Sequence, residues 1–190
     1  MPFLDRFRGA LRRLGLSRWK APPRACFVLL LRQPSELPLP VVQLAAERAL
    51  HIEFDGRGTG GNHVMRMGFI AIIQLGPEML HVFTSAKPYG KEFSSKRMPR
   101  LPSGPAWADH KAFLCLDNLT SETMDAARFQ QLGKLAAELL NNNCIAVFLP
   151  HLNAVVSNSA GLPARLRGFG SWDELLAAGQ PPALGVEDDG

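Results

Sequence analysis

Residues 25–54 of this chain read ACFVLLLRQPSELPLPVVQLAAERALHIEF, and residues 111–148 read KAFLCLDNLTSETMDAARFQQLGKLAAELLNNNCIAVF. Each stretch starts with an apolar run typical of a strand, passes through a polar turn that contains Ser-Glu, and continues as an amphipathic helix and another short strand. Two duplicated β-α-β units predict an α+β fold, a ferredoxin-like two-layer sandwich. This pattern alone predicts no reaction, because one fold hosts many functions.

The remaining elements follow from the same periodicities. The run from Cys26 to Arg32 is almost uninterrupted apolar sequence, which is typical of a central strand buried on both faces. We also expect helices over Pro40–Leu50 and Ser121–Leu140, and strands over Ala112–Leu116 and Cys144–Leu149. Between the two units, residues 64–75 and 79–84 predict a strand pair around the Gly76-Pro77 turn. These extra antiparallel strands would enlarge the ferredoxin-like plan.

The charge of the chain is concentrated at its beginning. Residues 1–24 hold seven of the 21 basic residues and one of the 17 acidic ones, so this segment carries +6 and the rest −2. The composition, 46% hydrophobic and 20% charged over 190 residues, is typical of one globular domain. We therefore predict a basic amphipathic N-terminal arm over residues 1–24, a single α+β domain over residues 25–180, and an acidic flexible tail over residues 181–190.

The N-terminal arm places large apolar residues at helical spacing, with arginines between them. Such a basic amphipathic helix would dock on an acidic protein partner, lie on an anionic membrane surface, act as an organelle transit peptide, or pack on its own domain. We take as candidate binding residues of the arm Phe3, Phe7, Arg8, Leu11, Arg12 and Arg13.

A second candidate contact is the long proline-rich connection over residues 86–109, which carries five basic residues. A loop of this length in a compact domain is usually functional or mobile. Glu92, and the lack of aromatic residues beyond Tyr89 and Phe93, argue against a nucleic-acid interface. We therefore expect no nucleic-acid partner, and we keep Tyr89 as a candidate for contact with a protein.

The familiar catalytic and cofactor motifs are not found. Residues 56–61 satisfy GxGxxG, but the sequence that follows is typical of a strand, whereas a dinucleotide fingerprint needs a helix there. The five histidines lack metal-ligand spacing, and there is no GxSxG, HExxH or P-loop motif. We expect neither a cofactor nor a metal, and an enzyme less than a binding protein, although Ser-His-Asp groups meet in space rather than in sequence.

The three cysteines, Cys26, Cys115 and Cys144, each lie inside an apolar strand pattern and form no CxxC pair. We expect buried free thiols in a reducing compartment. No apolar run reaches the roughly 18 residues needed to span a bilayer, and no secretory signal precedes the domain. These features predict a cytoplasmic protein, with peripheral membrane attachment as the alternative.

One segment points to a family. Trp107-Ala108-Asp109-His110-Lys111-Ala112 follows a Lys87-Pro88-Tyr89 loop and precedes a long helix and the strand Ala146-Val147-Phe148. With these motifs the chain resembles an uncharacterised bacterial family, the domain of unknown function numbered 4261, over about Ala25 to Ser157. The sequence departs from that pattern at Pro150-His151-Leu152, where an aromatic and glycine-rich segment is expected, and this departure puts a shared ligand in doubt.

The resemblance implies an α+β domain without established catalysis, in a family of accessory or toxin-neutralising proteins. It also implies that Trp107 and His110 would lie near the rim of any pocket. The leading hypothesis is a bacterial, non-enzymatic protein-binding protein of accessory or immunity type that acts through the N-terminal helix, the proline-rich loop, or both. The alternatives are an enzyme or small-ligand sensor with a pocket near Trp107, His110 and His151, and a peripheral membrane protein.

Overall fold

The computed structural model describes residues 26–54, 61–90, 101, 103–104, 106–120, 126–150 and 154–168. The described elements are β1 (Cys26–Leu31), α2 (Leu39–Leu50), β2 (Asn62–Met67), β3 (Ile70–Leu75), β4 (Glu78–Ser85), β5 (Ala112–Asn118), α3 (Ala126–Leu139), β6 (Cys144–Leu149), β7 (Ala154–Ser157) and α4 (Leu162–Gly168). The predicted arm, the glycine loop at 56–60, the first five residues of the helix expected over Ser121–Leu140 and the acidic tail lie outside the described residues.

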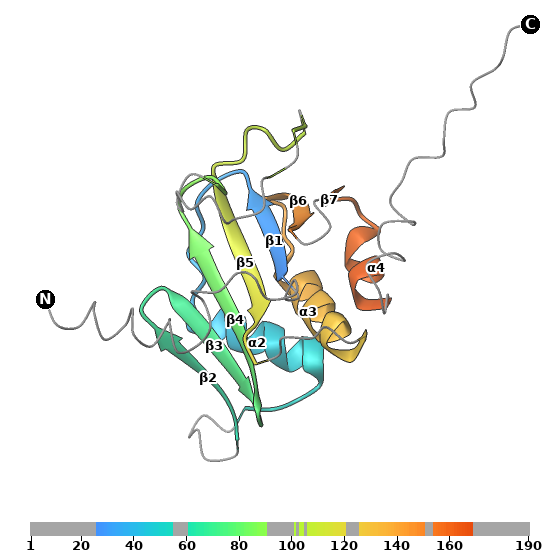
Figure 1. Ribbon diagram of the computed structural model, residues 1–190. Coiled ribbons are helices and arrows are strands. Elements are labelled where there is room, and N and C mark those ends of the chain that lie inside the picture. Colours follow the sequence, from blue (N-terminus) through green and yellow to red (C-terminus); the bar gives the residue numbers. More distant parts are fainter. Residues whose placement is uncertain are drawn as a thin grey trace, which may run out of the picture.

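The seven strands form one sheet in the order β2-β3-β4-β5-β1-β6-β7, and every neighbouring pair is antiparallel (Figure 1). Strands β4, β5, β1 and β6, with α2 after β1 and α3 after β5, follow the ferredoxin-like plan. The β2–β3 hairpin extends this sheet at one edge and β7 extends it at the other. The predicted α+β sandwich with extra antiparallel strands is confirmed.

The helices cover one face of the sheet, which we call the helix face (Figure 1). Along β1, Phe27, Leu29 and Leu31 point into the core beneath the helices, and the ring of Phe27 lies 5.7 Å from that of Phe129 on α3. The alternate residues of β1 point to the opposite face, which we call the open face. Because every residue of β1 is buried, its uninterrupted apolar sequence identified a central strand correctly.

Two boundaries differ from the sequence prediction. Residues 64–75, expected as one strand, form β2 and β3 around a tight turn at Gly68 and Phe69, where Gly68 has a φ of 63°. The apolar sequence pattern continues through this turn, so the pattern alone does not predict the turn. Gly68 was the available signal, because only glycine adopts that φ without a steric cost. The short strand expected after α2 is not formed, because His51 takes a left-handed conformation that ends the helix and residues 52–54 lie outside the sheet. The duplication is therefore not confirmed.

The sequence prediction assigned no element to residues 154–168, where the structure has β7 and α4. Helix α4 packs on α3 so closely that a Cβ on Gly133 would overlap the carbonyl oxygen of Leu166. An ion pair of 2.9 Å between Arg167 and Glu138 joins the same two helices. These contacts show why a short segment with little periodicity is helical, since tertiary packing stabilises it.

Candidate functional site

The open face of the sheet has a covered half and an exposed half. Over β1, β5 and β6 the side chains are buried beneath residues of the connection that joins β4 to β5. The aromatic ring of Tyr89 packs edge-on against the rings of Phe113 and Phe148, with 5.4 Å and 5.2 Å between ring centroids. Leu101 and Trp107 pack against the same cluster. Part of the proline-rich connection therefore serves as the second layer over this half of the sheet.

His110 fixes that layer in place. Its Nε2 accepts a hydrogen bond of 2.9 Å from the backbone N–H of Tyr89, and its Nδ1 lies 2.8 Å from the carbonyl oxygen of Trp107. Because an amide N–H only donates and a carbonyl only accepts, the ring is the neutral tautomer with its proton on Nδ1. Both ring nitrogens are thus engaged, and the side chain is only 6% exposed.

The structure therefore brings together Tyr89, Trp107 and His110, three of the residues that the sequence marked as candidates for binding. They hold the connection against the sheet. His151, the third histidine expected at a pocket there, lies outside the described residues, as do all six candidates of the N-terminal arm, Phe3, Phe7, Arg8, Leu11, Arg12 and Arg13.

The exposed half of the open face lies over the β2–β3 hairpin. Met65, Met67 and Phe69 are 37%, 42% and 59% exposed, and we call these three residues the hairpin patch. Met65 and Met67 lie opposite Ile72 and Ile70 of β3, and Ile72 is itself buried, so the most exposed apolar side chains of the hairpin are those of β2 and the turn. The sequence did not predict this patch. It placed the two methionines in a strand but did not show which face of the sheet their side chains occupy.

Strand β2 is also the edge of the sheet. Its inner side pairs with β3, and in the described residues no strand pairs with its outer side. The unpaired N–H and C=O groups of an edge strand are a template for another strand. The guanidinium of Arg66, which points to the helix face, donates a hydrogen bond of 2.6 Å to the carbonyl of Leu37.

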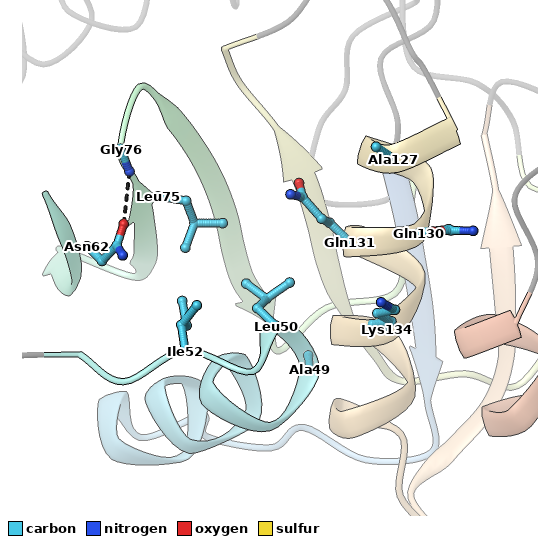
Figure 2. A pocket seen from close by; sticks show the side chains of 10 residues that line it. All are labelled: Ala49, Leu50, Ile52, Asn62, Leu75, Gly76, Ala127, Gln130, Gln131 and Lys134. Carbon is cyan, nitrogen blue, oxygen red and sulfur yellow. Dashed lines mark hydrogen bonds between the residues drawn. The ribbon is translucent and has the colours of Figure 1, made fainter.

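A groove of about 490 Å³ opens on the helix face between the hairpin and the two long helices (Figure 2). The apolar side chains of Leu50, Ile52 and Leu75 face one another across it, and Asn62 closes one end by accepting a 3.0 Å hydrogen bond from the N–H of Gly76. Helix α3 contributes the polar wall, formed by Gln130, Gln131 and Lys134. Gln131 extends from α3 toward the hairpin, whereas Gln130 extends the opposite way.

The groove suits a small molecule with an apolar body and polar or anionic substituents. Among the described residues that line it, Lys134 is the only charged one, and Oε1 of Gln131 is a buried acceptor with no hydrogen-bond partner in the described part of the chain. The sequence did not predict this site. A signal was present, since Gln131 and Lys134 are three positions apart and so share one side of a helix, but the β2–β3 turn that brings Asn62 to Gly76 was not recognised.

Within the described ranges, no group of three or more His, Cys, Asp and Glu side chains is placed to hold a metal ion. None of the described helices is long and apolar enough to cross a membrane. Comparisons of the chain with models of protein families, with curated proteins and with solved structures found no significant match. The resemblance to family 4261 stays a prediction, and function is inferred from the geometry of the surfaces described above.

Proposed function

We propose that this protein is a non-enzymatic protein-binding accessory protein whose partner adds an extended strand to the outer edge of β2. The observation that carries the proposal is the hairpin patch. Of the five large hydrophobic side chains that are exposed in the described residues, three lie in this one hairpin, beside a strand edge with which no described strand pairs. Exposed apolar groups gathered at one place are typical of interaction sites, whereas scattered ones are ordinary.

Strand addition explains both features of the hairpin at once. The partner's backbone would form hydrogen bonds with the edge of β2, and its alternate apolar side chains would pack beside Met65 and Met67. Methionine suits such a contact because its unbranched, polarisable side chain adapts to different neighbours. The partner is thus an extended segment of another protein with apolar residues at every second position.

The N-terminal arm is the second contact that we propose. Residues 1–24 carry a net charge of +6 and an apolar stripe, so they fit an acidic surface of the same partner. The described part of the proline-rich connection contributes indirectly, because Tyr89 and His110 face the sheet and hold its covered half closed. A bacterial accessory or immunity-type protein of the cytoplasm is the finer class that we propose, supported by the sequence resemblance and by the free thiols.

A photo-crosslinking residue at position 67, introduced into the full chain and expressed in the native host, tests the proposal. We expect a crosslink to a second protein, at a segment whose apolar residues alternate, and loss of that crosslink when Met65→Glu is added. The matched control places the same probe at Leu44, which is also an exposed apolar residue but lies on α2. Position 44 should give no crosslink to that protein.

Three outcomes would contradict the proposal. Crosslinks from position 67 to residues 1–24 of the same chain would show that the arm covers the patch. Crosslinks to position 67 of a second copy would show a homodimer, which size-exclusion chromatography with light scattering would detect independently. Equal yields of the crosslink to the second protein from positions 44 and 67 would show that this protein does not bind the hairpin patch selectively.

A second candidate function, small-ligand binding, is favoured by the groove. Oε1 of Gln131 is a buried acceptor at its wall, and it would accept a hydrogen bond from a ligand hydroxyl or amine. A thermal-shift screen of small organic acids and alcohols tests this function with the wild type and with Gln131→Leu and Lys134→Met variants. A compound that stabilises the wild type but neither variant would support ligand binding in the groove. Equal thermal shifts in all three proteins would exclude the groove as the binding site of that compound.

A further inference from the structure

We propose that Cys26 and Cys115 form a cross-strand dithiol site, which hydrogen peroxide or a similarly small peroxide oxidises to a disulfide between the two central strands. Their Sγ atoms lie 3.4 Å apart, although 89 positions separate the residues in the sequence. Both residues lie on the open face, Cys26 at the start of β1 and Cys115 in β5. Both are free thiols in this structure.

The register of the sheet explains the contact. Cys26 lies opposite Asp117 and Val28 lies opposite Cys115, so the two cysteines are diagonal neighbours on one face of adjacent strands. A disulfide bond is about 2.05 Å long, so the sulfur atoms need to approach by roughly 1.3 Å. Side-chain rotation alone does not supply this approach, because the Cβ atoms of diagonal neighbours lie further apart than the roughly 3.5–4.5 Å of a disulfide, so the start of β1 at Cys26 also shifts toward β5 when the bond forms.

The diagonal placement also predicts a reversible bond. Diagonal neighbours have Cβ atoms further apart than directly opposite residues do, so a disulfide between them departs from the relaxed geometry. Strained disulfides have more oxidising potentials and are reduced more readily than relaxed ones. The site would therefore return to the dithiol state in a reducing compartment after the peroxide is consumed.

The reaction needs no further reactant. The first thiolate attacks one peroxide oxygen, the O–O bond breaks, and a sulfenic acid forms with release of one water molecule. The sulfur of the second cysteine then attacks the sulfenic sulfur, the S–O bond breaks, and a second water molecule leaves. The two thiols lose two protons and two electrons in total, and these reduce both oxygen atoms of the peroxide to water.

The surroundings restrict which oxidant can react and how fast. Cys26 and Cys115 are 8% and 7% exposed, and Tyr89 lies over them, so a small peroxide has better access than a bulky disulfide. The hydrogen bond with Cys115, burial, and the negative charge of Asp117 raise the pKa of the Cys26 thiol well above its ordinary value. Since the thiolate is the reactive form, oxidation near neutral pH is slow.

Cys144 provides an internal control. It is buried on the helix face, and its thiol donates to the carbonyl oxygen of Ala146 at 3.4 Å. A register shift in the β1–β6 ladder at Leu30 and Leu31 places Cys144 opposite Leu31, so its side chain lies on the other side of the sheet from the dithiol. No described cysteine lies close enough to Cys144 for the two to share a disulfide.

Peptide mapping of the full chain after hydrogen peroxide treatment tests the proposal, with free thiols alkylated under denaturing conditions. We expect a peptide pair joined through Cys26 and Cys115 in the wild type and in Cys144→Ser, none in Cys26→Ser or Cys115→Ser, and recovery of the free thiols with dithiothreitol. Tyr89→Phe should leave the rate nearly unchanged, whereas Tyr89→Ala should raise it several-fold by opening the cover. The wild-type map alone decides the proposal if a variant fails to fold.

Two results would overturn the inference. One is a wild-type map in which Cys26 and Cys115 are still recovered as free thiols after peroxide treatment many times longer than the time that oxidises an exposed cysteine peptide added to the same tube. The other is oxidation that stops at a sulfenic or sulfinic acid on one cysteine, or that joins two chains, because neither product requires a dithiol.

Discussion

The backbone N–H of Tyr89 donates a 2.9 Å hydrogen bond to Nε2 of His110, which joins the two ends of a connection 21 positions long. The same imidazole binds the carbonyl of Trp107 through Nδ1. The His110 side chain therefore joins the two ends of the connection and keeps the ring of Tyr89 on the sheet. Its two hydrogen bonds also fix the imidazole as the tautomer with the proton on Nδ1. His110, one of the candidate binding residues, is engaged by the backbone at both ring nitrogens.

Replacing His110 with alanine should destabilise the protein by about 1–3 kcal/mol, because the buried N–H of Tyr89 loses its acceptor. Urea unfolding measures the free energy, and hydrogen exchange should show loss of protection at the Tyr89 amide. The matched control is Asp109→Ala, at an exposed neighbouring position. Similar free-energy losses in the two variants would contradict the role assigned to the imidazole.

Gly133→Ala should destabilise the packing of α4 on α3, even though alanine is the better helix former by about 1 kcal/mol. The new Cβ overlaps a backbone oxygen, that of Leu166, which cannot rotate away. We expect a net loss of roughly 1–3 kcal/mol in the free energy of unfolding. Gly161→Ala is the control, since its Cβ would enter open space, and it should stay within about 0.5 kcal/mol of the wild type.

Alkaline pH should weaken the fold through Cys144. Burial raises the pKa of this thiol from 9.0 to about 12, so between these values the unfolded chain releases a proton that the folded chain retains. The contribution of this thiol to the free energy of unfolding is complete below pH 9. It declines as the pH rises toward 12, by at most about 1.4 kcal/mol per pH unit for one group. Denaturant titrations at pH 8 and about pH 10.5 should show a smaller decline for Cys144→Ala than for the wild type; equal declines would exclude Cys144 as the source.

His51→Gly should stabilise the C-terminus of α2. His51 is exposed and has a φ of 55°, a left-handed conformation that costs most residues about 1 kcal/mol and glycine very little. Glycine also increases the entropy of the unfolded chain, so we expect a net gain of about 0.5 kcal/mol. The β-branched variant His51→Val should lose stability instead, and thermal unfolding of both variants measures the difference.

Local periodicity predicted the elements that are long or strongly apolar. The strand at Cys144–Leu149 has the expected bounds, and the helix expected at Pro40–Leu50 begins one residue earlier. Prediction failed where one residue decides the backbone, as at Gly68, which divides an apparently continuous strand. It also failed for α4, because contact with Gly133 on α3 rather than its own sequence pattern stabilises that helix.

The candidate sites were harder to predict because they depend on register and strand order. Period-two alternation places Cys26 and Cys115 each on a face of its own strand, but only the pairing of β1 with β5 brings their sulfurs to 3.4 Å. The groove likewise needs Leu75 of the hairpin opposite Gln131 of α3. Residues this distant in the sequence share a site only after the topology is known.

The central place of β1 has a mechanical consequence for the arm that precedes it. Strand β1 begins at Cys26 and pairs with β5 on one side and β6 on the other. A pulling force applied to residues 1–24 would load β1 along its own axis, in shear against both ladders. Hydrogen bonds loaded in shear share the force and break together, whereas a peripheral strand peeled from its end loses them one after another. The arm is therefore attached to the strand best able to resist tension, and a partner held by it would be difficult to detach by unfolding the domain.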